Sequence, residues 1–178
     1  MSLTYASLQQ LLIERQEKTQ QWQSDLFNQA VEFSEALKQK LAPPENPIQL
    51  PSGSDTWPPF QLSEPVVIDG QASLANPLTH SGFEKFIAKG ALSFSIVLSF
   101  QETKPSCSIV CSCVVRFNED KAKFGFGEAI EVVSNWYTLD DAVIAFQERI
   151  EAAYHTDSYA RSDKPPVGFF HLQADSNC

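Results

Sequence analysis

The chain has 178 residues, of which 43% are hydrophobic and 20% charged, and this composition is typical of a soluble globular protein with one domain. The formal net charge is −9, and the sequence contains no basic patch. We therefore expect neither a nucleic acid nor a membrane as a partner. The start MSLTYASLQQ lacks the pattern of a signal peptide, and no run approaches the ~20 apolar residues of a membrane helix.

Residues 4–41 contain neither Pro nor Gly and are predicted to form one long helix. Their apolar positions recur about every 11 residues, which places them in one stripe. The stripe comprises Leu8, Leu11, Leu12, Trp22, Leu26, Ala30, Phe33, Leu37 and Leu41, with Arg15 and Thr19 in its gap. An unbroken helix of ~57 Å would overhang a strand of ~36 Å. We expect a second copy of the protein to cover the overhang; the alternative is a break near residues 18–21.

Residues 42–80 hold eight of the eleven prolines and are predicted to form a connector that packs down through Trp57 and Phe60. Within it, residues 59–70 are typical of a short strand with an apolar part at 66–68 and a turn at 69–70. Ser81 and Glu84 have the spacing of a capping box, so residues 82–89 are predicted to be a short helix. A strand leading into a turn at Lys89 and Gly90 is the alternative.

Residues 90–133 are organised as three runs of alternating residues, which predict an antiparallel meander. The expected strands cover residues 92–100, 107–117 and 124–133. One face of this sheet is bulky and apolar, and the opposite face consists mostly of small residues. The expected fold class is α+β: an antiparallel meander of three to five strands, with the long N-terminal helix and a C-terminal helix packed on it.

The C-terminal helix is predicted to start after Thr138, with Asp141 in the capping-box position. Its apolar stripe should cover the bulky face of the sheet, and consists of Leu139, Ala142, Val143, Phe146, Ile150 and Ala153. Residues 1–41 and 81–154 are thus expected to form one domain, joined by the connector 42–80. Residues 155–178 are expected to be an extended tail that Phe169 and Phe170 pin to the domain.

The small-residue face is the candidate surface for a ligand or a partner. Its members, with one acidic neighbour, are Ser93, Ser95, Ser99, Ser112, Gly125, Gly127 and Glu128. A face this smooth lets a helix approach closely, and the favoured interpretation is that residues 22–41 of the first helix cover it. The alternative is that part of the face stays open as a groove.

Glu128 lies on the same face of the third predicted strand as its apolar residues. A regular strand alternation would therefore bury its side chain. A bulge at Gly125 or Gly127, or a position at the strand end, would send it outward instead. A buried pairing with Lys or Arg and a catalytic carboxylate are the other hypotheses.

Three of the four cysteines, Cys107, Cys111 and Cys113, lie on one predicted strand. The strand holds such neighbours about 6 to 7 Å apart, too far for a normal disulfide, and the spacing lacks a zinc knuckle. We therefore expect reduced core thiols, no metal, no cofactor and a cytoplasmic location. His80, His155 and His171 are expected to be surface residues.

No motif identifies a family. The predicted function is a non-catalytic cytoplasmic protein-protein interaction or adaptor protein that forms a homodimer through its N-terminal helix. The alternative is a small-molecule binding module with an apolar pocket between sheet and helix. That pocket would be lined by Phe94, Phe100, Phe124, Phe126 and Trp136. The third hypothesis is a hydrolase-like enzyme that uses Glu128 with His80.

Overall fold

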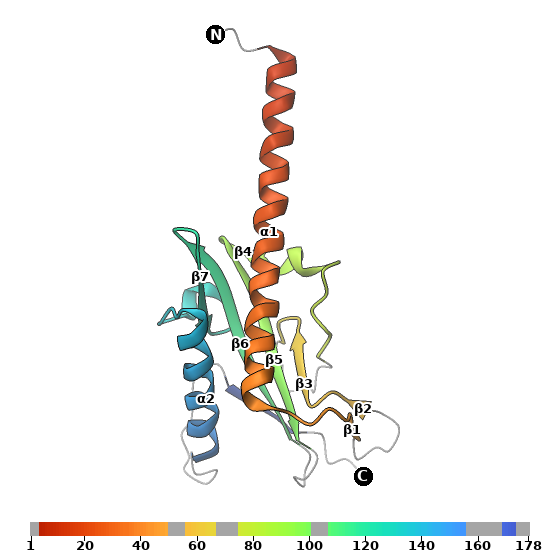
Figure 1. Cartoon of the computed structure of the whole chain (residues 1–178), viewed down its shortest axis with the longest axis vertical. Helices are drawn as coiled ribbons and strands as arrows, with labels where there is room; N and C mark the ends of the chain where they lie inside the picture. The colour runs from red at the N-terminus through yellow and green to blue at the C-terminus, as the bar shows by residue number, and fades with distance from the viewer. Residues whose placement is uncertain (1–3, 50–55, 67–74, 101–106, 156–168, 174–178) are drawn as a thin grey trace.

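The structure is a computed structural model, and it describes residues 4–49, 56–66, 75–100, 107–155 and 169–173. Its helices are α1 (Tyr5–Leu41), η1 (Phe83–Phe86, 3-10), η2 (Ile130–Val132, 3-10) and α2 (Leu139–His155). Its strands are β1 (Ile48–Gln49), β2 (Thr56–Trp57), β3 (Phe60–Ser63), β4 (Ile87–Ala88), β5 (Ala91–Phe100), β6 (Cys107–Asn118), β7 (Lys121–Phe126) and β8 (Phe169–Gln173). The expected α+β fold is confirmed (Figure 1).

The main sheet is antiparallel and has the strand path β3-β5-β6-β7. Strands β5, β6 and β7 are the predicted meander. β6 is long enough to have two neighbours on one side: β7 pairs with residues 113–118 and β8 with residues 107–111. The short strand β4 pairs with the start of β5, and β1 and β2 pair only with each other within the described chain.

Helix α1 runs unbroken from Tyr5 to Leu41, so the predicted alternative of a break is wrong. Its start is capped by Thr4, whose side chain accepts from the Ser7 backbone N–H while the Ser7 hydroxyl accepts from the Thr4 backbone N–H. Its end is marked by Ala42 in the left-handed conformation, followed by two prolines that cannot continue the helix. Local sequence thus accounts for both ends.

Both helices lie side by side on the bulky face of the sheet (Figure 1). The expectation that α1 covers the small-residue face is wrong. The buried core between helices and sheet comprises Leu26, Ala30, Phe33, Leu37, Leu92, Phe94, Ile96, Leu98, Ile109, Cys111, Cys113, Val115, Phe124, Phe126, Ala142, Ala145 and Phe146, joined by Leu78 and Phe83. Sheet width explains this arrangement. Four strands about 4.8 Å apart span ~19 Å, whereas one helix with its side chains is ~10 Å across.

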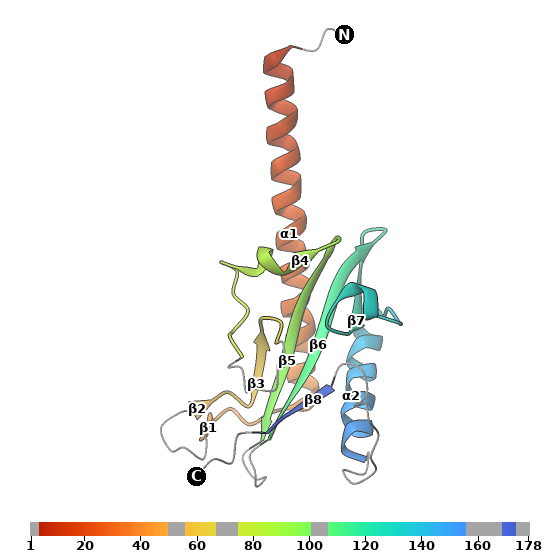
Figure 2. The same cartoon turned by 180° about the vertical axis from the view of Figure 1, so that it is seen from behind.

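The small-residue face is covered by the chain's own loops. Val66 and Ala75, from the proline-rich connector, pack on Val97 and Val110 at the centre of this face. The segment of residues 127–137 folds back over β7 and ends in a bridge between Tyr137 and Phe124 (Figure 2). The connector is therefore a cover, but it covers the face that had been assigned to α1.

Two boundaries differ from expectation. The third strand ends at Phe126 rather than at residue 133, because the chain turns at Gly127 and forms η2. For residues 83–88 a short helix and a strand were the predicted alternatives, and the structure contains both: η1 is followed by β4. A turn at Lys89 and Gly90 follows, and φ is positive at both residues.

The connector strand and the tail are described in part. β3 pairs with β5 through residues 60–63, and the predicted turn at 69–70 lies outside the described residues. The tail, expected to be extended, contributes β8 at residues 169–173. Its other residues, 156–168 and 174–178, also lie outside the described part of the chain.

Candidate functional site

The predicted surface on the small-residue face is mostly buried within the protein. Ser95 is fully buried, and its hydroxyl accepts a hydrogen bond of 3.1 Å from the backbone N–H of Val66. Ser99 and Ser112 are also buried, and only Ser93 of the four serines is half-exposed. The connector therefore covers the centre of the face that the alternative interpretation left open as a groove.

Gly125 and Gly127 lie beneath the segment that follows β7. A Cβ atom on Gly125 would lie 2.3 Å from Cγ1 of Val133, and one on Gly127 would lie 2.8 Å from Cγ2 of Val132. Next to them, the Arg116 guanidinium lies 3.9 Å from the ring centre of Trp136. These glycines let the chain's own backbone approach the sheet closely.

Glu128 follows the end of β7 and is exposed, so the expectation of a strand-end position agrees with the structure better than a buried carboxylate does. Nearby, the Lys89 ammonium forms an ion pair with Glu131, and its hydrogen bond lowers the pKa of that carboxyl. His80, the proposed partner of Glu128, is exposed and packs on the rings of Phe27 and Phe83 at 5.2 and 5.5 Å.

The apolar pocket predicted between sheet and helix is filled by aromatic rings. Phe33 of α1 stacks on Phe124 with 5.1 Å between ring centres, and Phe94 and Phe126 are within 6.4 Å of it. Trp136 lies on the opposite face of the sheet, against Arg116. The side chain of Phe100 lies outside the described residues. Of the five residues expected to line a pocket, Phe94, Phe124 and Phe126 thus form part of the core.

Cys111 and Cys113 are free and buried, and their sulfur atoms lean to within 3.9 Å of each other. Burial raises the pKa of the Cys113 thiol well above its ordinary value, which keeps it protonated and unreactive. Among the described residues, no group of three His, Cys, Asp or Glu side chains could hold a metal ion.

The feature that stands out from the domain is the N-terminal half of α1, which we call the projecting segment (residues 5–21). It extends beyond the sheet as a single free-standing helix (Figure 1). Every one of its residues is exposed, and Trp22 is the first residue of α1 that is partly buried. At 1.5 Å per residue, its 17 residues project by about 26 Å.

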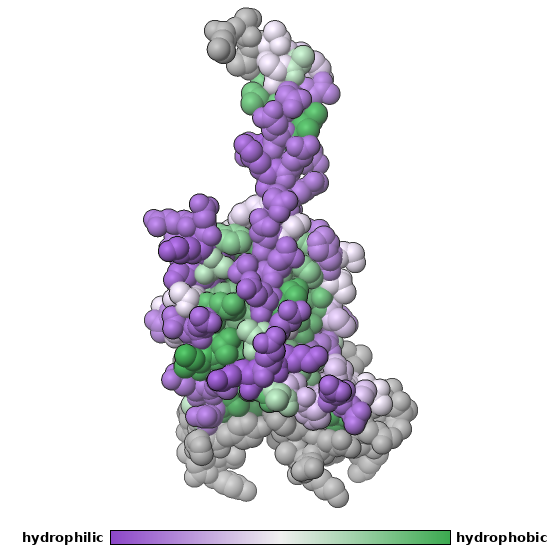
Figure 3. Space-filling view, viewed as in Figure 1, coloured by the Kyte–Doolittle hydropathy of each residue, from purple (hydrophilic) through white to green (hydrophobic). Residues whose placement is uncertain are grey.

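Large apolar side chains are exposed on the projecting segment. Leu8, Leu11 and Leu12 are 44%, 57% and 67% exposed, and Figure 3 shows apolar residues among the polar ones at this end of the molecule. Leu8 precedes the buried Leu26 by 18 residues, which is five helical turns. The exposed leucines therefore continue the stripe that packs on the sheet.

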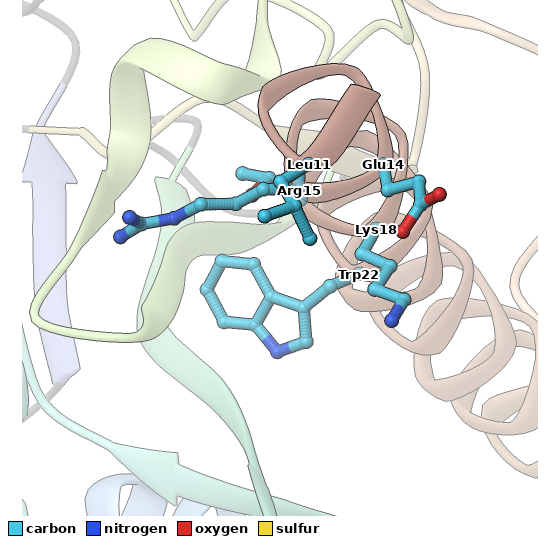
Figure 4. A pocket seen from close by; sticks show the side chains of 6 residues that line it. Leu11, Glu14, Arg15, Lys18 and Trp22 are labelled. Atoms are coloured by element: carbon cyan, nitrogen blue, oxygen red, sulfur yellow. The ribbon is translucent and has the colours of Figure 1, made fainter. Parts of the chain in front are cut away.

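An open hollow of about 490 Å³ lies along this helix at the boundary with the domain. Its lining residues are Leu11, Glu14, Arg15, Lys18, Thr19 and Trp22. Arg15 and Glu14 diverge to opposite sides of the hollow, and the ring of Trp22 lies between them (Figure 4). Apolar surface at the centre and opposite charges at the rim suit a protein surface better than a small catalytic cleft.

From the sequence, the greater length of the first helix relative to the strands indicated that this end of the helix would be exposed. The residues that were selected as a candidate site lie on the sheet instead.

Within the described residues, no helix combines the length and the apolarity that a membrane crossing needs. No protein-family model, curated protein or solved structure matches the chain. Its function is therefore inferred from its residues and their geometry.

Proposed function

We propose that this chain is a non-catalytic cytoplasmic protein-protein interaction protein that forms a homodimer through the projecting segment of α1. The observation that carries the proposal is the unbroken helix with Leu8, Leu11 and Leu12 exposed in line with the core stripe. Apolar surface grouped on one side of an element is typical of an interaction site.

The geometry supports association without a large ordering cost. The packed half of α1 is anchored in the core by Leu26, Phe33 and Leu37, so the helix is already nucleated when it leaves the domain. A partner that binds the projecting segment meets a preformed surface, and preformed surfaces lose less conformational entropy on binding. The free thiols of Cys111 and Cys113 support the cytoplasmic part of the proposal.

Sedimentation velocity of the full chain over a wide range of concentration tests the dimer. We expect a species of twice 19.8 kDa. The double variant Leu8→Glu, Leu12→Glu should weaken the dimer by about 1,000-fold or more, because each buried leucine is worth ~1.5–3 kcal/mol and the loss occurs on both copies.

A matched control is Ala6→Glu, Gln20→Glu. Both residues are exposed and lie outside the stripe, so this variant adds the same two charges to the same segment. It should remain dimeric. A wild-type chain that stays monomeric at the highest concentration, or a control that dissociates as far as the leucine variant, would contradict the proposal.

A further inference from the structure

The direction in which the exposed stripe points restricts how a partner helix can bind. Leu8 lies on the same side of α1 as Leu26, which packs on the sheet. By helical phase, the stripe of the projecting segment therefore faces the side of α1 on which the sheet lies. The segment itself extends beyond the end of the sheet (Figures 1 and 2).

This direction excludes a parallel pair of helices. A second α1 running in the same direction and facing the stripe would have to place its own residues 22–41 in the space that the first copy's sheet occupies. A second helix running in the opposite direction meets only the projecting segment, and ends where Trp22 enters the domain. Only the antiparallel orientation leaves room for both domains.

The distribution of charge favours the same orientation, and it does not oppose a second copy as the occupant. The projecting segment has two acidic residues, Glu14 and Glu17, and two basic residues, Arg15 and Lys18, so its net charge is zero. The full charge of −9 thus lies on the rest of each chain. An antiparallel pair joins the neutral segments and holds the acidic domains at opposite ends, farther apart than the ~8 Å over which charges interact in physiological salt.

The stripe is also complementary to itself when one copy is reversed. Its upper part has Leu8 and Leu12, and its lower part has Arg15 and Thr19 next to the hollow beside Trp22. Reversal about a point between Ile13 and Glu14 brings Leu8 opposite Thr19 and Leu12 opposite Arg15. Leu8 then meets Thr19 and the hollow, and Leu12 meets the aliphatic stem of Arg15, with the second copy's Leu12 about 4.5 Å farther along the helix axis.

From these relationships we infer that the partner of the projecting segment is a second copy of this chain bound antiparallel, with Leu8 facing Thr19 and Leu12 facing Arg15. The inference rests on the proposed homodimer and specifies its geometry. The two domains lie at opposite ends of the assembly, and residues 5–21 of the two copies form the interface.

Disulfide trapping tests the orientation. Differently tagged copies with Leu8→Cys and Thr19→Cys are co-expressed in a background with Cys107→Ser and Cys178→Ser, which keeps the buried Cys111 and Cys113. Equivalent residues of the two copies would be separated by about 16 Å along the helices. We therefore expect the mixed disulfide to exceed either self-linked product by about tenfold or more, because Cα atoms more than ~7 Å apart are not bridged.

A second pair, Leu12→Cys with Arg15→Cys, should also give the mixed disulfide. Equivalent residues of this pair are only about 4.5 Å apart along the helices, so self-linked products are expected beside it, and this pair tests the centre of the interface rather than its orientation. Self-linked Leu8→Cys dimers as the main product would overturn the antiparallel orientation and leave the homodimer standing. A chain that sediments as a dimer but forms none of these cross-links would overturn the interface. A strictly monomeric chain would overturn the homodimer and the inference together.

Discussion

Phe33 of α1 stacks on Phe124 of β7, with 5.1 Å between the ring centres and 26° between the ring planes. The same ring meets the edges of Phe94 on β5 and Phe146 on α2, each at 6.2 Å. All four rings are at most 1% exposed. Phe33 therefore joins both helices to the meander.

Replacing Phe33 with alanine should lower the free energy of unfolding by about 3–5 kcal/mol, because the change removes buried apolar contacts and leaves a cavity. Urea denaturation at one fixed protein concentration measures this loss, since association also affects stability. The control is Glu35→Ala, at an exposed position of the same turn, which should change stability by no more than ~0.5 kcal/mol. Equal effects of the two substitutions would contradict the assigned core.

Gly125→Ala should destabilise the protein by about 1–3 kcal/mol, because the added Cβ would lie 2.3 Å from Cγ1 of Val133. The double variant Gly125→Ala, Val133→Ala should recover part of the loss, since it removes the clashing methyl groups. Thermal unfolding of the single and double variants provides the comparison.

Gly82→Ala is the matched control for this substitution. No atom lies within 4 Å of a Cβ built at Gly82, and its φ of 171° is extended backbone that any residue adopts. This variant should be close to wild type. A Gly125 variant as stable as the Gly82 variant would show that residues 127–137 do not pack on β7 as described.

Glu64 links the connector to η1 through an ion pair of 2.9 Å with Lys85. The hydrogen bond from Lys85 lowers the pKa of Glu64 below its ordinary value. A lowered pKa in the folded state contributes stability above the ordinary Glu pKa, and this contribution is lost as the pH falls through the lowered value. Glu64→Gln should thus destabilise the protein at neutral pH by no more than ~1 kcal/mol, and the difference should vanish in acid.

Chemical denaturation across the acidic pH range measures this dependence, and added salt should also reduce the difference. Glu45→Gln, at an exposed carboxyl of the same connector, controls for the change in net charge. A difference between wild type and Glu64→Gln that grows as the pH falls would contradict the assigned ion pair.

Several features were predictable because their causes are local. The absence of Pro and Gly located the first long helix, and the capping residue Thr138 located the start of the second. Alternation located the strands of the meander. The end of β7 at Phe126 was not predicted. The side chains of residues 128–133 alternate as they would in a strand, although this segment forms a turn and η2.

The candidate site could be predicted only in outline. Comparing helix length with strand length identified an overhang, since both lengths follow from residue counts. The serines and glycines of the sheet were selected because a smooth face can bind a ligand or a helix. Their covers, Val66 and residues 127–137, lie in loops whose positions no local pattern determines.

The sequence by itself determined the helices, the order of the meander strands and the unbroken apolar stripe of α1, because periodicity and capping act over a few residues. Only the tertiary structure decided which layer covers which face. One helix is too narrow for the bulky face, so α1 and α2 share it, and the connector covers the small residues. Because α1 packs on the bulky face, the stripe of the projecting segment faces the side on which its own domain lies. This direction limits the orientation in which a partner can bind.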